Sequence, residues 1–266
     1  MKLHVTVRGT GPDLVLLHGW GLNGACWGRF ADRLAEHWRV HEVDLPGHGR
    51  SAWHAECTGL DGVILAVRRH VPEGATVLGW SLGGIIALRL AQLAGPVVGP
   101  LVLVATTPRF TAGRRWPCGM ARAQVDAFGE RLAVDYRRTL NEFLTLQVRG
   151  EVEPHRLLRE LKTNLARGGP PQPAALDQGL DLLRSCVLRP ALPGIGQPAL
   201  VVAGESDRLT PPQASQYLAQ SLPNARLCTI ERAGHAPFLS HGTEVLDAMI
   251  EFAGFRTPSV AAGSNP

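Results

Sequence analysis

The sequence predicts an α/β fold with a mostly parallel central sheet, flanking helices and a helical insertion. In residues 1–107, and again from residue 189, short apolar runs typical of buried strands alternate with helical stretches. That alternation is expected for βαβ units and a parallel sheet. Between the two parts, residues 108–188 lose the alternation and carry helical spacing of apolar residues instead. We therefore expect a core made of residues 1–107 and 189–254, a lid made of residues 108–188, and a disordered tail in residues 255–266, which are small and polar.

Short strand-like runs mark the strands expected in the core, at residues 14–17, 40–43, 76–78, 101–104, 199–203 and 226–230. Apolar and polar residues also alternate in residues 3–7, which predicts a further strand rather than a signal peptide, because no apolar central region follows. The apolar runs are all far shorter than the roughly 20 residues that a membrane-spanning helix needs.

The insertion is predicted to consist of amphipathic helices. Apolar or core-facing residues recur at spacings of mostly three and four, first at Leu132, Tyr136, Leu140, Phe143, Leu144 and Gln147, then at Leu157, Leu158, Leu161 and Leu165. Pro154 precedes the second group, and two glycines followed by two prolines at residues 168–171 come after it as a break.

A G-x-S-x-G motif at Gly79, Ser81 and Gly83 is the most informative local pattern. It follows an expected strand and precedes a helical stretch, which is the strand, turn and helix context of a nucleophile elbow. Glycines on both sides relieve the crowding that such a turn imposes on the serine backbone. Ser81 is therefore the candidate nucleophile.

Two later segments supply a candidate acid and base, each just after an expected strand. Asp207 follows the run at 199–203, and His235 follows the run at 226–230. The chain order Ser81, Asp207, His235 is that of an α/β-hydrolase triad. Glu205 lies close enough in sequence to compete with Asp207 as the acid.

A glycine-rich turn at His18, Gly19, Trp20 and Gly21 follows the strand expected at 14–17. Backbone N–H groups in such a turn can stabilise the negative charge that develops on a reacting carbonyl oxygen. We assign the two oxyanion donors to the backbone amides of Trp20 and Leu82. The Trp20 side chain then lines the pocket mouth or packs on the core.

The net charge of +4 resides in the insertion. Residues 109–188 contain 13 Lys and Arg against 9 Asp and Glu, whereas the rest of the chain contains 14 of each. Two interpretations stay open: a solvated helix face, or a docking surface for an acidic partner. Nucleic acid is a poor candidate, because no nucleic-acid-binding motif accompanies the charge.

The five cysteines, at positions 26, 57, 118, 186 and 228, have no C-x-x-C or metal-ligand spacing. Scattered thiols in an odd number suggest reduced cysteines, which predicts a cytoplasmic protein.

Several segments together resemble the pimeloyl-acyl-carrier-protein methyl ester esterases of biotin synthesis, a family of α/β-hydrolases. The shared segments are residues 18–23, 43–51, 79–84, 143–147 and 235–241, and the resemblance extends to about residue 253. Its more specific parts are the elbow tryptophan, Trp80, the segment at 143–147 and the His-Ala-Pro-Phe run at 235–238.

The resemblance implies a serine esterase without metal or organic cofactor, expected to be a monomer, whose substrate is carried by an acyl carrier protein. It implies Ser81, Asp207 and His235 as the triad and Trp20 and Leu82 at the oxyanion site. It also implies that a lid segment touches the acyl chain, comprising Phe143, Leu144, Thr145, Leu146 and Gln147. Arg138 and Arg159 stand where lid arginines are expected to hold the carrier, although Glu142 and His155 occupy neighbouring places where more positive charge is expected.

Two rival functions remain. Another serine hydrolase on the same scaffold would be a broad short-chain carboxylesterase, a lactonase or a carbon-carbon bond hydrolase, since the triad does not set substrate choice. A non-catalytic binding protein of the same fold is the second rival, and an intact triad argues against it.

Overall fold

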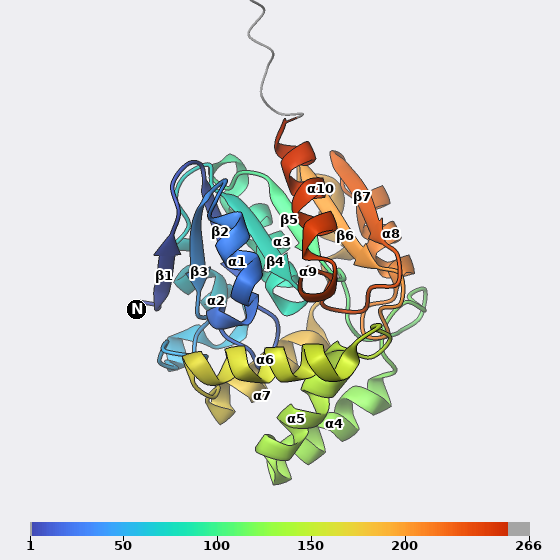
Figure 1. Ribbon diagram of the computed structural model, residues 1–266. Helices are drawn as coiled ribbons and strands as arrows, with labels where there is room; N and C mark the ends of the chain where they lie inside the picture. The colour runs from blue at the N-terminus through green and yellow to red at the C-terminus, as the bar shows by residue number, and fades with distance from the viewer. Residues whose placement is uncertain (1, 255–266) are drawn as a thin grey trace, which may run out of the picture.

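A seven-stranded sheet forms the centre of the computed structural model, which describes residues 2–254 (Figure 1). The expected tail, residues 255–266, lies outside the described residues. The strands are β1 (Val5–Arg8), β2 (Asp13–Leu17), β3 (Arg39–Val43), β4 (Thr76–Trp80), β5 (Leu101–Val104), β6 (Ala199–Gly204) and β7 (Ala225–Ile230). Their order is β1-β3-β2-β4-β5-β6-β7, with β1 antiparallel to β3 and the other pairs parallel. The predicted fold class is confirmed.

Helices cover both faces of the sheet. Successive side chains of a strand point to opposite faces, so the hydrophobic core is divided into two clusters. They are α1 (Gly28–Leu34), α2 (Gly59–Arg68), α3 (Leu82–Ala94), α8 (Pro212–Ser221), α9 (Pro237–Ser240) and α10 (Gly242–Gly254). Leu14 and Leu16 of β2 pack with the cluster that contains α1 and α10, whereas Val15 and Leu17 pack with the cluster that contains α2, α3 and α8. Side chains that alternate in this way, all buried, are expected of a central parallel strand.

Short 3₁₀ helices complete the core at η1 (Gly24–Trp27), η2 (Ala55–Cys57), η3 (Gly95–Val97) and η4 (Arg189–Gly194). Among residues 2–254, no helix is both long and apolar enough to cross a membrane.

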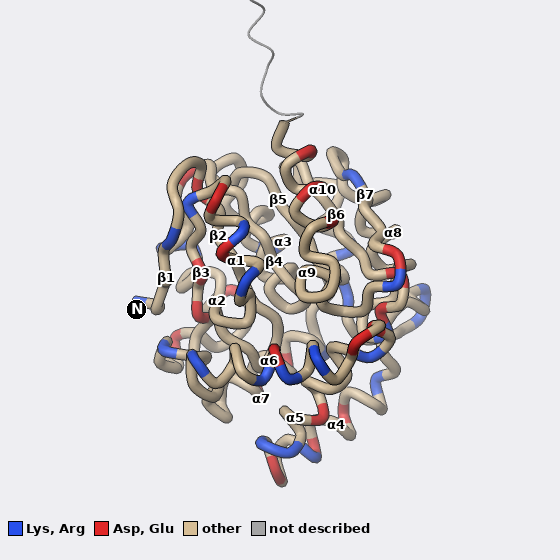
Figure 2. The backbone as a smooth tube through the Cα atoms, in the orientation of Figure 1, with Lys and Arg blue, Asp and Glu red and all other residues tan. Residues whose placement is uncertain are grey.

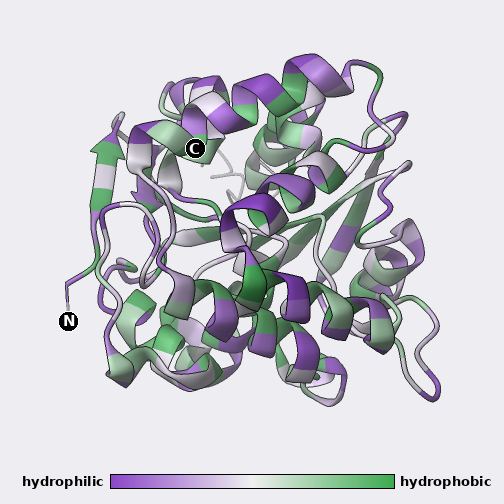
Figure 3. Cartoon of the chain, turned by 90° about the horizontal axis from the view of Figure 1, so that it is seen from below, coloured by the Kyte–Doolittle hydropathy of each residue, from purple (hydrophilic) through white to green (hydrophobic). Residues whose placement is uncertain are grey.

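Four helices between β5 and β6 form a layer below the sheet in the view of Figure 1. They are α4 (Arg122–Val134), α5 (Tyr136–Gln147), α6 (Pro154–Gly168) and α7 (Pro173–Ser185). Figure 3 views them from that side and shows hydrophilic and hydrophobic residues alternating around each helix. We call these four helices the lid.

The first group of helically spaced residues in the lid spans two helices. Asp135 is both the C-cap of α4 and the N-cap of α5. Its side chain accepts a hydrogen bond from the Arg138 amide at 3.0 Å. The second group behaves as expected, because α6 begins at Pro154 and ends at Gly168.

The order of the strands fixes where a ligand site belongs. The chain passes from β2 to β3 on one side and then crosses to β4 on the other side of β2. In open α/β sheets, ligands bind beyond the carboxyl ends of the strands where this direction reverses. The residues that follow β2 and β4 are therefore the expected site.

Glu42 in β3 is a buried carboxylate, 3% exposed, whose pKa burial raises to about 7, although the Arg8 guanidinium 2.6 Å away opposes the shift. The folded protein then binds this proton more tightly than the unfolded chain, in which Glu titrates near 4.5. The stabilisation by protonated Glu42 is complete below pH 4.5 and is lost as the pH rises to about 7.

As the pH rises from 4.5 to above 7, the wild type is expected to lose about 3 kcal/mol of unfolding free energy through Glu42. The Glu42→Gln variant is expected not to show this loss. Urea unfolding of the wild type and the variant at pH 5 and pH 8 measures it. Equal pH dependence in the two proteins would show that Glu42 titrates normally.

Candidate active site

Ser81 occupies a strained turn between β4 and α3. Its backbone has φ 55° and ψ −115°, and its side chain is largely buried. A Cβ on Gly79 would lie 2.4 Å from the Gly83 carbonyl oxygen, and one on Gly83 would lie 2.0 Å from that of Leu17. No other residue type fits these two positions, so the elbow depends on both glycines.

Asp207 and His235 meet although 28 residues separate them. Their Oδ2 and Nδ1 atoms are 2.8 Å apart, and both side chains are 1% exposed. Asp207 also accepts hydrogen bonds from the amides of Leu209 and Thr210 and from the Thr210 hydroxyl, at 2.8, 3.0 and 2.7 Å. These bonds hold the carboxylate in a fixed position against the His235 ring.

The second ring nitrogen of His235 is available for chemistry. Within residues 2–254, Nε2 is buried and has no hydrogen-bond partner. With Nδ1–H donated to Asp207, Nε2 carries the lone pair that a general base needs. By contrast, the exposed Glu205 carboxylate accepts a bond from the Arg232 amide at 3.0 Å, so Asp207 is the carboxylate that contacts His235.

Trp80, which the sequence marked only as part of the motif, holds the histidine loop. Its indole N–H donates to the His235 carbonyl oxygen at 2.8 Å, and the two rings lie 5.9 Å apart. Glu151, between α5 and α6, accepts a 2.7 Å bond from the Gly234 amide. Burial raises the pKa of Glu151. Only the folded chain brings residues 80, 151 and 234 together, so no sequence spacing indicated these contacts.

The glycine-rich turn at residues 18–21 lies against the elbow. A Cβ on Gly19 would lie 3.5 Å from that of Ser81. His18 is buried, donates from Nδ1 to the Gly19 carbonyl oxygen at 2.8 Å and accepts at Nε2 from the Leu45 amide at 3.0 Å. Burial lowers the pKa of His18 to about 4, so the ring is neutral and fixes the turn. The Leu82 amide is the first of α3, where an N–H has no partner within the helix.

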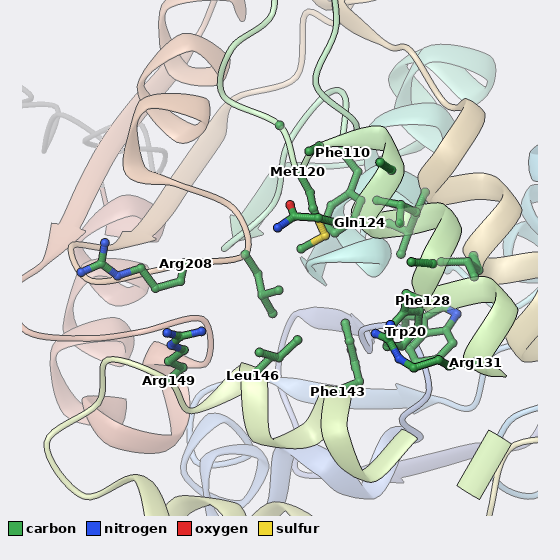
Figure 4. A pocket seen from close by; sticks show the side chains of 18 of the residues that line it. Trp20, Phe110, Met120, Gln124, Phe128, Arg131, Phe143, Leu146, Arg149 and Arg208 are labelled. Atoms are coloured by element: carbon green, nitrogen blue, oxygen red, sulfur yellow. The ribbon is translucent and has the colours of Figure 1, made fainter. Parts of the chain in front are cut away.

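An apolar cavity of about 640 Å³ lies between the lid and the strand ends (Figure 4). Its apolar lining includes Trp20, Phe110, Met120, Phe128, Phe143, Leu146, Leu180, Leu183 and Leu209. The Trp20 ring contacts Phe143 and Phe128 edge-on, with centroids 4.8 and 5.4 Å away. Ser81 and His235 are outside the lining. The lining does include Trp20, which follows Gly19, and Leu209, whose amide donates to Asp207.

The residues expected to touch the acyl chain divide between the cavity and its surroundings. Phe143 and Leu146 line the cavity. Leu144 instead packs in the core cluster that includes Leu161 of α6. Thr145 is exposed and donates to the Asn141 carbonyl oxygen, and Gln147 is buried outside the lining. Consecutive helical residues point about 100° apart, so one helix cannot direct all five into one cavity.

Arg138 and Arg159 are exposed on α5 and α6. Glu142 lies 3.1 Å from the Arg138 guanidinium and 3.7 Å from that of Arg131. Figure 2 shows basic residues along α5 and α6 interspersed with acidic ones.

The family model for the alpha/beta hydrolase fold matches residues 12–242. An esterase from Exiguobacterium antarcticum has a similar structure, with a TM-score of 0.85 and 25% identity over 95% of both chains. A bromoperoxidase from Bacillus anthracis has a TM-score of 0.84 at 21% identity, also over 95% of both chains, and supports the fold alone.

The curated relatives are more similar in sequence. A pimeloyl-[acyl-carrier protein] methyl ester esterase from Nitrosomonas europaea is 44% identical over 90% of this chain and 94% of its own. The protein of that name from Stenotrophomonas maltophilia is 43% identical over 97% of this chain and 98% of its own. The chain therefore belongs to the alpha/beta hydrolases and, within them, to the family of these methyl ester esterases.

Proposed function

We propose that this chain hydrolyses the methyl ester of a pimeloyl group carried by an acyl carrier protein. The observation that carries the proposal is the buried pair of Asp207 and His235, whose loop is bonded by Trp80, the residue before the strained Ser81. Within residues 2–254, Nε2 of His235 has no hydrogen-bond partner. The 42–44% identity to esterases named for this substrate supports the choice of ester.

In the proposed mechanism, His235 Nε2 removes the proton of the Ser81 hydroxyl as its oxygen attacks the ester carbonyl. Asp207 keeps the Nδ1–H tautomer and stabilises the imidazolium. The amides of Trp20 and Leu82 bind the oxyanion. The leaving methoxide takes the proton from His235 and departs as methanol.

Water then releases the acid. His235 removes a proton from the water molecule as it attacks the acyl-enzyme carbonyl, and the serine oxygen recovers a proton when the ester bond breaks. These roles require no metal or organic cofactor.

The cavity supports an acyl substrate. Its volume of about 640 Å³ lies in the usual range for small-molecule sites, and its walls are mainly aliphatic and aromatic. Phe143, Leu146 and Trp20 are the proposed contacts of the acyl chain. Leu144 and Gln147 support the same helix from its buried side.

The proposal is tested by supplying the methyl ester of pimeloyl-acyl carrier protein and measuring methanol release, with p-nitrophenyl acetate and a lactone as comparison substrates. We expect the carrier-linked ester to have the highest kcat/KM. Hydrolysis of the small esters without cleavage of the carrier-linked ester would favour the broad carboxylesterase instead. Restored growth without biotin, in a strain that lacks this esterase, checks the function in cells.

Arg138 and Arg159 are the proposed contacts for the acidic carrier protein. Reversing both to Glu is expected to raise KM for the carrier-linked ester about tenfold, because exposed charge pairs contribute up to about 1 kcal/mol each. Added salt is expected to raise the wild-type KM in the same direction. Steady-state kinetics on the carrier-linked ester measures both effects.

The matched control reverses Arg29 and Arg69, which are exposed on α1 and after α2, outside the lid. Hydrolysis of p-nitrophenyl acetate should barely change in either double variant. Equal losses on both substrates would mean that the lid arginines support structure. An unchanged KM would assign them to a solvated face.

A further inference from the structure

Two arginine side chains line one side of the mainly apolar cavity, which Gln124 and Arg131 also line. Arg149 follows α5, and Arg208 lies in the loop after β6. Figure 4 shows them near each other, across the cavity from Trp20 and Phe128. The loops that bear them are in contact, since a Cβ on Gly150 would lie 2.8 Å from the Ser206 carbonyl oxygen.

Neither guanidinium has an ion pair or a hydrogen bond within residues 2–254, and both side chains are exposed. Three other arginines of the lid instead lie within ion-pair distance of carboxylates. The pairs are Arg138 with Glu142, Arg156 with Glu153 and Arg184 with Asp181, at 3.1, 2.8 and 3.1 Å. Arg131, the third arginine in the lining, lies over the Phe128 ring and near Glu142.

Two guanidinium groups without a partner among the described residues, beside a mainly apolar cavity, suit one chemical class of ligand: an apolar chain that ends in a carboxylate or phosphate group. Arginine binds carboxylate and phosphate through two parallel N–H donors, and such bonds are stronger than those between neutral groups. The apolar walls would hold the chain while the arginines bind its charged end.

We propose that Arg149 and Arg208 form an anion-binding subsite for the end of the substrate remote from the methyl ester. The proposal rests on the esterase function proposed above and adds a specificity-determining pair to it. The anion is a carboxylate or phosphate group. Its two sources are the free carboxylate of a monomethyl dicarboxylate and the phosphate of the thioester arm of a carrier protein.

The test compares two matched pairs of substrates. Monomethyl pimelate and dimethyl pimelate, with rates counted per ester, differ in a carboxylate. The methyl pimeloyl thioesters of 4′-phosphopantetheine and of pantetheine differ in a phosphate. For each pair, the ratio of kcat/KM for the anionic substrate to that for the neutral one is measured in the wild type and in the Arg149→Gln, Arg208→Gln double variant.

We expect this ratio to fall about tenfold in the double variant for at least one pair, through KM, while the neutral substrates keep their kcat/KM. A fall in the dicarboxylate pair identifies the carboxylate as the ligand, and a fall in the thioester pair identifies the phosphate. The Arg149→Lys, Arg208→Lys variant keeps the charge and is expected to retain part of the preference.

The matched control removes two other exposed lid charges, in the Arg114→Gln, Arg167→Gln variant, and is expected to leave both ratios unchanged. If both kcat/KM ratios are also unchanged in the Arg149→Gln, Arg208→Gln variant, the anion-binding subsite is overturned and the esterase function still stands. Failure of the wild type to hydrolyse any of these methyl esters, together with the carrier-linked ester, would overturn the esterase function itself. Activity on the neutral substrates also verifies that each variant is folded.

Discussion

Replacing Ser81 with alanine is expected to lower kcat for ester hydrolysis by about 10⁶-fold, the scale seen when the nucleophile of a serine hydrolase is removed. The change deletes one hydroxyl and keeps the β-carbon that the elbow already accommodates, so the fold should persist. Methanol release and labelling by a fluorophosphonate probe measure the loss.

Ser185→Ala is the control for that substitution. Its hydroxyl is exposed on α7 and bonds only to the Asp181 carbonyl oxygen within the described chain. We expect activity and labelling close to those of the wild type. Comparable labelling of the Ser81→Ala variant would mean that another residue is the nucleophile.

Replacing Asp207 with asparagine is expected to lower kcat by about 10⁴-fold. The amide can donate to Nδ1 of His235 at the position where the carboxylate now accepts, which places the proton on Nε2 and removes the base. Glu205→Gln is the matched control, because Glu205 is two residues away but bonds to the Arg232 amide instead. Steady-state kinetics and circular dichroism separate a loss of chemistry from a loss of fold. A larger effect at Glu205 would transfer the acid role to it.

The fold and the members of the candidate triad could be predicted because their signals are local. The central strands β2, β4, β5 and β6 each contain a short apolar run, and Ser81, Asp207 and His235 each come soon after a strand that the sequence predicts. Parallel strands place their carboxyl ends at one edge, so three residues that follow strands are expected at the same edge.

Features that depend on contacts between distant residues, or on the direction in which a helical side chain points, could not be predicted from the sequence. Apolar spacing continues through Asp135, so it does not reveal that α4 ends there and α5 begins. Residues 143–147 form one continuous sequence segment, yet the helix directs only Phe143 and Leu146 into the cavity. Arg149 and Arg208 line the same cavity because their two loops are in contact, and the loops meet only after the sheet has formed.

The bond between Glu151 and the Gly234 amide has a consequence for protein engineering. At the other end of α6 the lid is bonded to the core by Asn23, whose side-chain Nδ2 donates to the carbonyl oxygens of Leu165 and Gly169 at 2.9 and 3.1 Å. A lid transplanted from a relative to change specificity would have to reproduce both ties. Without a carboxylate at position 151, the new insertion would leave the residue before His235 without its acceptor, and a change of specificity would also disturb the general base.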